Sequence, residues 1–143
     1  MTEEQTKLLL KDLSARLPYD VKLQISSWDD TNMEYVDKSD TLYYISSDNH
    51  IRTSSEDQDY YIDEVKPYLF PMSSMTDEQK EYINGCWGIN DEFNFEINPD
   101  WGEYSISYIE AQEYIEWLKE NHFDYRRLIE KGLAIDATNL NIY

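Results

Sequence analysis

The chain has 143 residues, the length of one domain of ordinary size. It carries 30 acidic and 12 basic residues, and the formal net charge of −18 argues against direct binding to nucleic acid or to an anionic membrane. Aromatic residues make up 15% of the sequence, which excludes a disordered acidic tail and predicts a packed core. We therefore expect residues 1–143 to form a single acidic domain.

The cysteine content and the start of the chain predict a soluble, intracellular protein. Cys86 is the only cysteine, so no disulfide can form within the chain, and we expect it to be a small, partly buried side chain. The first residues are polar and acidic, unlike a secretory signal. No stretch of the sequence approaches the roughly 20 apolar residues of a membrane span.

The N-terminal segment predicts an amphipathic helix over residues 3–16. Thr6 or an earlier polar residue can cap this helix, and Pro18 stops it. Its apolar stripe consists of four leucines at helical spacing, namely Leu9, Leu10, Leu13 and Leu17. The stripe is expected to face the core.

Alternating runs after this helix predict short strands. The expected strands cover residues 20–28, 33–36, 42–45 and 50–54. Because each run closely follows the previous one, the pattern favours an antiparallel meander over βαβ units. The aromatic stretch 60–70 is expected to be extended, with Pro67 placing it at a sheet edge or in a loop.

Two capping boxes predict the starts of two later helices. Thr76 with Gln79 begins the first, which should run to about Asn84, with Gly85 as its C-cap. Ser107 with Glu110 begins the second, which ends near residues 121–122. Its apolar face is expected to contain Ile109, Tyr114 or Ile115, and Leu118.

The remaining patterns are shorter. Phe93, Phe95 and Ile97 alternate as in a short strand. Residues 125–131 predict a short helix closed by Gly132, and residues 133–143 an extended segment that docks on the body.

Together the elements predict an α+β fold: an N-terminal helix, an antiparallel sheet of about four or five strands, and C-terminal helices packed on one face. The core is expected to contain Leu9, Leu13, Leu17, Val21, Leu23, Ile25, Ile115, Leu118 and Leu128.

No catalytic signature stands out. Paired acids occur at Asp29/Asp30, Asp57/Asp59, Asp63/Glu64 and Asp91/Glu92. Such pairs can do acid–base chemistry when burial separates their pKa values, but chance pairs are expected among 30 acids. A calcium loop starting at Asp57 is disfavoured, because Ile62 and Tyr68 stand where Gly and Glu are needed. His122 fits a helix end better than a metal site. We expect no cofactor and no structural metal.

Three segments resemble a family of small uncharacterised proteins from gut Bacteroidales genomes, their phages and mobile elements. They are Leu10-Lys-Asp-Leu-Ser-Ala-Arg-Leu-Pro-Tyr19, Val65-Lys-Pro-Tyr-Leu-Phe-Pro-Met-Ser-Ser-Met-Thr76 and His122-Phe-Asp-Tyr-Arg-Arg-Leu-Ile-Glu-Lys-Gly-Leu-Ala134. The chain departs from its relatives after Ala134, where they carry a Glu-Ala-Pro stretch. The resemblance brings no activity and no functional residue. It implies an accessory gene, often phage-borne, and the cytoplasm of a bacterial host.

The charge pattern suggests a function in binding. Residues 56–120 hold 17 acids and 3 bases, interleaved with Tyr and Trp. This density keeps the protein in solution or forms a face for a basic partner. The expected partner contacts are Glu56, Asp57, Asp59, Tyr60, Tyr61, Asp91, Glu92, Asp100 and Trp101.

We expect a non-enzymatic interaction protein that binds a basic protein surface. In a phage or mobile element, it would be a counter-defence inhibitor that presents DNA-like charge to a nucleic-acid-handling host protein. One alternative is a metal-dependent hydrolase or nucleotide-handling enzyme that uses clustered carboxylates, and another is a virion or assembly accessory protein. A concave pocket of converging carboxylates would favour the enzyme.

Overall fold

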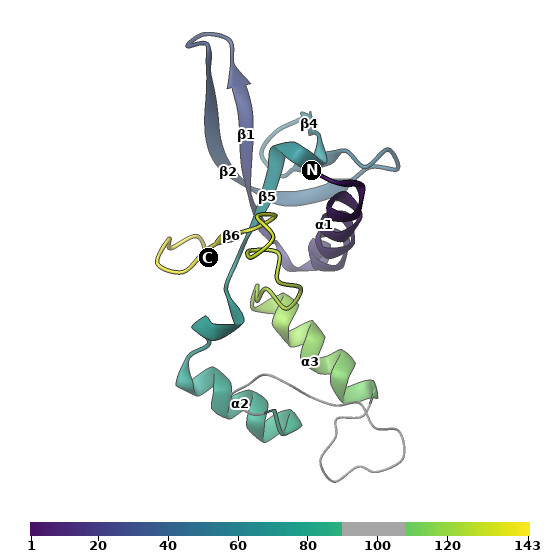
Figure 1. Ribbon diagram of the computed structural model, residues 1–143, viewed down its shortest axis with the longest axis vertical. Helices are drawn as coiled ribbons and strands as arrows, with labels where there is room; N and C mark the ends of the chain where they lie inside the picture. The colour runs from purple at the N-terminus through teal and green to yellow at the C-terminus, as the bar shows by residue number, and fades with distance from the viewer. Residues whose placement is uncertain (90–107) are drawn as a thin grey trace.

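The computed structural model describes residues 1–89 and 108–143, which form a sheet and three α-helices. In Figure 1, helix α1 (Glu3–Arg16) lies beside the sheet, whereas α2 (Asp77–Trp87) and α3 (Tyr108–Glu120) lie beyond one end of it. The strands are β1 (Lys22–Asp29), β2 (Glu34–Ile45), β3 (Ile51–Thr53), β4 (Asp59–Tyr60), β5 (Val65–Leu69) and β6 (Ile135–Asp136). Short 3₁₀ turns span Leu17–Tyr19, Ile62–Glu64 and Met72–Ser74. The α+β class expected from the sequence is confirmed.

The described strands form one mixed sheet of six strands in the order β4-β3-β2-β1-β5-β6. All neighbouring pairs are antiparallel except β5 and β6. The parallel strand β6 shows that the chain after residue 133 does dock on the body. Pro67 lies opposite Leu23 of β1, and pairing with β6 begins one residue later, at Tyr68. At Pro67 itself β5 is therefore paired on one side.

The two strands expected at 33–36 and 42–45 are wrong as separate elements. The structure has one strand of 12 residues, β2, whose register with β1 runs unbroken from Glu34 to Thr41. The polar residues between the two apolar runs stay in the ladder because β1 satisfies their backbone groups. Ser26 also donates a hydrogen bond to Asp37 across the pair, at 2.6 Å.

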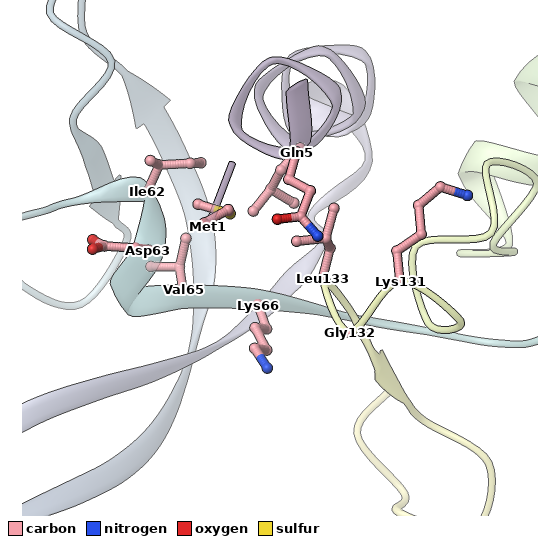
Figure 2. A pocket seen from close by; sticks show the side chains of 10 residues that line it. Met1, Gln5, Ile62, Asp63, Val65, Lys66, Lys131, Gly132 and Leu133 are labelled. Atoms are coloured by element: carbon pink, nitrogen blue, oxygen red, sulfur yellow. The ribbon is translucent and has the colours of Figure 1, made fainter. Parts of the chain in front are cut away.

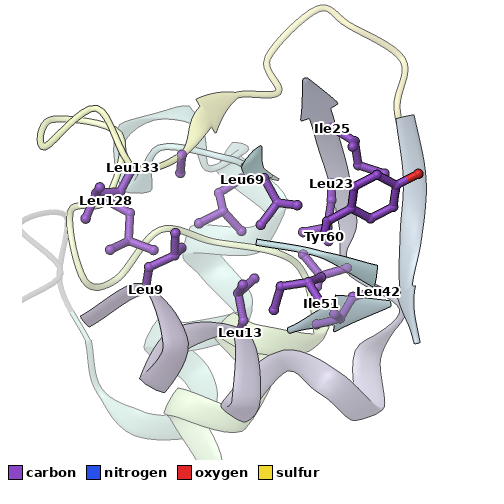
Figure 3. Close-up of a cluster of buried hydrophobic side chains, with 13 residues drawn as sticks. Leu9, Leu13, Leu23, Ile25, Leu42, Ile51, Tyr60, Leu69, Leu128 and Leu133 are labelled. Atoms are coloured by element: carbon purple, nitrogen blue, oxygen red, sulfur yellow. The ribbon is translucent and has the colours of Figure 1, made fainter. Parts of the chain in front are cut away.

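The main core lies between α1 and the sheet. Figure 3 shows Leu9 and Leu13 of α1 reaching toward Leu23, Ile51 and Leu69 of the strands. Leu128 and Leu133 close this cluster from the C-terminal segment. These positions confirm the apolar faces read from the sequence.

The prediction that Leu17 belongs to this core is wrong, since 36% of its surface is exposed. The helix ends at Arg16, and the 3₁₀ turn through Pro18 takes Leu17 off the buried face. Ile115, on α3, is only half-buried.

A second, smaller core lies between α2 and α3. It is built from Met75, Ile83, Ile89, Ala111, Tyr114, Leu118 and Phe123. Helix α2 continues through Gly85 and ends at Trp87, with Gly88 in the left-handed C-cap conformation at φ +66°, so the expected end at Asn84 is wrong. Packing of Trp87 against Tyr114, with ring centroids 5.5 Å apart, offsets the cost of about 1 kcal/mol for a helical glycine.

The expected capping box at Thr76 is confirmed by hydrogen bonds in both directions with Gln79, of 2.9 and 3.2 Å. Helix α1 begins with a second such box, whose cap is Thr2, one of the earlier polar residues that the sequence offered besides Thr6. The expected cap Ser107 and the expected strand 93–97 lie outside the described residues.

Residues 125–131 form turns and not the expected helix. The Asp124 carboxylate accepts hydrogen bonds from the backbone N–H groups of Leu128 and Ile129, at 2.8 and 2.9 Å, which replace helical bonds. Arg127 has φ +59°, a conformation that interrupts a right-handed helix.

Candidate interaction surfaces

The expected contact residue Glu56 is engaged inside the fold. Its carboxylate lies 2.7 Å from the Lys38 ammonium through both oxygens, and the Tyr60 hydroxyl also donates to it. The hydrogen bond from Lys38, followed by that from Tyr60, lowers the pKa of Glu56. Glu56 therefore fastens the loop 54–59 to β2.

Tyr60 was wrongly expected to be an exposed contact. Its ring is 1% exposed and belongs to the main core, where strand β4 pairs with β3 at Ile51. Burial, followed by the hydrogen bond to Glu56, raises the pKa of Tyr60. Tyr61 points the other way and is 65% exposed, with its ring edge-on to His50 at 5.1 Å.

Two further expected contacts share one cation. Arg52 Nη1 lies 3.1 Å from Asp57 and Arg52 Nε lies 2.8 Å from Asp59. The three carboxylates at positions 56, 57 and 59 thus form ion pairs with two cations, Lys38 and Arg52. These pairs leave the loop with a small net negative charge. The other expected contacts, Asp91, Glu92, Asp100 and Trp101, lie outside the described residues.

Asp40 anchors the same loop from β2. It accepts hydrogen bonds from the hydroxyls of Ser54 and Ser55, at 3.1 and 2.8 Å. Burial alone would raise the pKa of Asp40, but the donors around it, chiefly from residues 53–55, bring it down to about 2. Asp40 is a structural carboxylate.

The first exposed surface is the hairpin of residues 26–39, here called the β1–β2 arm. In Figure 1 it stands clear of the other elements. On one side, β5 pairs with β1 only as far as Ile25, and on the other, β3 pairs with β2 only from Leu42 onward. Within the described residues the arm has no neighbouring strand.

The β1–β2 arm exposes large apolar side chains. Trp28 is 48% exposed, Met33 75% and Tyr35 73%, and the rings of Trp28 and Tyr35 meet edge to face at 5.2 Å. The sequence carries a signal for this, because Trp28 falls in phase with the polar residues of β1 and not with Leu23 and Ile25.

The tip of the β1–β2 arm is ordered by Asp29. Its carboxylate accepts hydrogen bonds from the Thr31 backbone and the Asn32 side chain, at 2.9 and 2.8 Å. The bond from Asn32, followed by that from Thr31, lowers the pKa of Asp29. Met33 has φ +53°, an uncommon conformation for a side chain without a local polar group. Asp30 and Glu34 are exposed beside it.

The second exposed surface is a groove between α2 and α3, with a volume of about 450 Å³. Its aromatic lining consists of Tyr82, Trp87 and Trp117. Tyr82 stacks on Trp117 at 5.7 Å and meets Trp87 edge-on at 5.9 Å. Acidic and aromatic residues of this half of the sequence therefore share one surface.

Three carboxylates of α3 line the same groove, at Glu113, Glu116 and Glu120. Glu113 accepts from the Trp87 indole at 3.4 Å, and Glu116 lies 2.7 Å from the Lys119 ammonium. Glu116 also accepts from the hydroxyl of Tyr19, a bond that raises the pKa of Tyr19 to about 12. Only Glu116 has a cation against it among the described residues.

A smaller cavity of about 280 Å³ lies between the start of α1 and β5. Gln5, Ile62 and Leu133 line it, and Figure 2 shows the ammonium ends of Lys66 and Lys131 pointing away from these side chains. The two lysines do not converge on the cavity, so it has no cationic centre.

Cys86 and His122 lie outside the two exposed surfaces described above. Cys86 is exposed on α2, so the expectation of a partly buried side chain is wrong. His122 stacks on Tyr143 with ring centroids 3.7 Å apart. Within residues 1–89 and 108–143, no three His, Cys, Asp or Glu side chains group closely enough to hold a metal ion. No helix in those ranges is long and apolar enough to cross a membrane.

Comparison with protein-family models, with curated proteins and with solved structures finds no match to this chain. The features of this chain that bear on its function are the two exposed surfaces, the β1–β2 arm and the α2–α3 groove.

Proposed function

We propose that the protein is a non-enzymatic interaction protein that binds a basic protein surface through the β1–β2 arm. The observation that carries this proposal is the exposure of Trp28, Met33 and Tyr35 on a hairpin with which no third strand pairs among the described residues. Grouped exposed apolar side chains mark interaction sites, and Trp and Tyr are frequent binding anchors.

The charge of the β1–β2 arm selects the partner. The exposed acids Asp30, Glu34 and Asp37 flank the apolar side chains. A second copy of this chain, also of net charge −18, would meet them with like charge. A partner with Lys and Arg around an apolar cleft complements both features, and its approach is accelerated by the long-range field.

The resemblance to proteins of phages and mobile elements suggests the class of partner. Host proteins that handle nucleic acid carry basic surfaces, and an inhibitor of such a protein would exploit them. Duplex DNA presents about one charge per 1.7 Å. On the loop 56–59 the acids are held by Lys38 and Arg52, so the arm supports the proposal better than this loop does.

The test uses two exposed tyrosines of the same strand. Tyr35 is 73% exposed on the β1–β2 arm, and Tyr43 is 68% exposed outside it. Wild-type protein and the variants Tyr35→Ser and Tyr43→Ser are immobilised, proteins from a lysate of the native host are captured, and the partner is purified for binding measurements.

We expect Tyr35→Ser to weaken binding by about tenfold or more and Tyr43→Ser to leave it within about twofold. Binding should also weaken as salt rises, because screening shortens to about 8 Å at physiological ionic strength and further above it. A partner that binds both variants equally and ignores salt would contradict the proposal.

A further inference from the structure

We propose that the α2–α3 groove is a second binding site, which takes the ammonium or guanidinium group of a Lys or Arg side chain from a basic protein segment. The site lies on different elements from the β1–β2 arm. Its volume of about 450 Å³ falls within the range of about 300–1,000 Å³ that is typical of ligand sites.

The aromatic lining is suited to a cation. Tyr82, Trp87 and Trp117 lie with their ring centroids 5.7 to 6.4 Å apart. A cation is attracted to a ring face when it lies within about 6 Å of the centroid, and Trp is the strongest such ring. A charge seated in the groove can therefore contact two rings at once. Tyr82 is 51% exposed, so the approach to the rings is open.

The carboxylates supply the opposite charge. Glu113 and Glu120 line the groove and make no ion pair within the described residues, whereas Glu116 is matched by Lys119. Among the described residues, the groove therefore presents two carboxylates without an ion-pair partner beside an aromatic surface. Both carboxylates would attract the positive charge of a bound Lys or Arg side chain.

The same chemistry already holds cations elsewhere in this fold. The Lys38 ammonium lies 5.2 Å from the centroid of Tyr60 and 2.7 Å from the Glu56 carboxylate. The Arg126 guanidinium lies 5.0 Å from the centroid of Tyr125, with its Nε 3.3 Å from Asp12. In both places a ring and a carboxylate surround one cation. The groove has the rings and the carboxylates, and a cation from outside completes the arrangement.

Charge also decides between occupants. An apolar peptide would leave Glu113 and Glu120 facing apolar groups, at a cost in desolvation. A second copy of this chain would bring further negative charge to the same place. A basic segment matches both the rings and the acids.

The test is an NMR titration with a short peptide, acetyl-Gly-Arg-Gly-amide, against the full chain. The indole N–H signals report each tryptophan and are assigned with single Trp→Phe variants. The matched control peptide replaces Arg with citrulline, which keeps the shape of the side chain and removes its charge. We expect the Arg peptide to shift the signals of Trp87 and Trp117 in a saturable way, and the citrulline peptide to shift them much less.

The carboxylates are tested by the variant Glu113→Gln/Glu120→Gln. Gln at 113 can still accept the hydrogen bond from the Trp87 indole, so this variant removes charge with little change in packing. We expect affinity for the Arg peptide to fall about three- to tenfold. The control Glu4→Gln/Glu130→Gln removes two exposed charges away from the groove and should change affinity by less than about twofold.

Three results would overturn the proposal. The citrulline peptide could shift the two indoles as strongly as the Arg peptide does, which would make the groove an apolar site. The control variant could lose as much affinity as the groove variant, which would mean non-specific attraction. The signals of Trp87 and Trp117 could shift with protein concentration alone, which would make a second copy the occupant. Trp28 reports on the arm in the same spectra, so failure here is distinguishable from failure of the proposed function.

Discussion

Arg16 donates a hydrogen bond from Nε to the Asp12 carboxylate at 2.7 Å, and both side chains are completely buried. A second guanidinium nitrogen donates to the backbone carbonyl of Phe123, also at 2.7 Å. Arg126 lies 3.3 Å from the other oxygen of Asp12. This network joins α1 to the chain that follows α3, at the boundary between the two cores.

Replacing Arg16 with Met should lower the free energy of unfolding by about 3–5 kcal/mol, because it leaves the Asp12 carboxylate buried with a weaker partner. Urea denaturation followed by circular dichroism measures the change. The matched control is Lys7→Met, which breaks the exposed pair between Lys7 and Glu3 on the same helix and should cost at most about 1 kcal/mol. Equal losses of unfolding free energy in the two variants would show that the buried pair contributes no more to stability than the exposed one.

Leu13 is fully buried against the sheet, so Leu13→Ala should cost about 2–5 kcal/mol. Leu17 lies four residues later on the same helical spacing but is 36% exposed. The same truncation there should cost about 1 kcal/mol or less. Thermal unfolding of both variants checks the difference, and an unchanged melting temperature in Leu13→Ala would refute the packing of α1.

Thr76 caps α2, and Thr76→Ala should cost about 0.5–2 kcal/mol. The hydroxyl is the cause, since it accepts from the Gln79 backbone at 3.2 Å. Thr76→Ser keeps that acceptor and should retain most of the stability. If the Ser variant is as unstable as the Ala variant in urea denaturation, the cap contributes through something other than its hydroxyl.

His122 should make stability depend on pH. Burial, followed by the charge of Arg16, lowers the pKa of His122 from 6.5 to about 4. Above pH 6.5 the imidazole is neutral in both states, and as pH falls toward 4 only the unfolded chain takes up the proton. The free energy of unfolding should therefore drop as the pH falls through this window.

The variant His122→Asn isolates this contribution. Asn tolerates the left-handed backbone at this position, where φ is +61°. The variant loses the stacking on Tyr143 at every pH, but its stability should fall less than that of the wild type between pH 6.5 and 4. Urea denaturation at several pH values gives both curves, and parallel curves would contradict the assignment.

The candidate surfaces were only partly visible in the sequence. Composition predicted an acidic, aromatic protein, and both exposed surfaces have that character. The residues that form these surfaces differed from the predicted ones. Tyr60 was expected at the surface and lies in the core, while Trp28, Tyr35 and the α2–α3 groove were not singled out. For Trp28 the alternation within β1 carried a signal of exposure. Tyr60 is buried because α1 and the neighbouring strands cover it, and the residues beside it in the sequence do not encode that contact.

Features that rest on local interactions could be predicted from the amino-acid sequence alone. The capping box at Thr76 and the leucines of α1 depend on partners three or four residues away, and the alternation of Leu23 and Ile25 on the pleat of one strand. Other features depend on contacts between distant segments. Strand β2 is continuous because β1 pairs with its polar middle, and Gly85 remains helical because Trp87 packs on α3. In each case a contact between segments far apart in the sequence outweighs a local preference of about 1 kcal/mol.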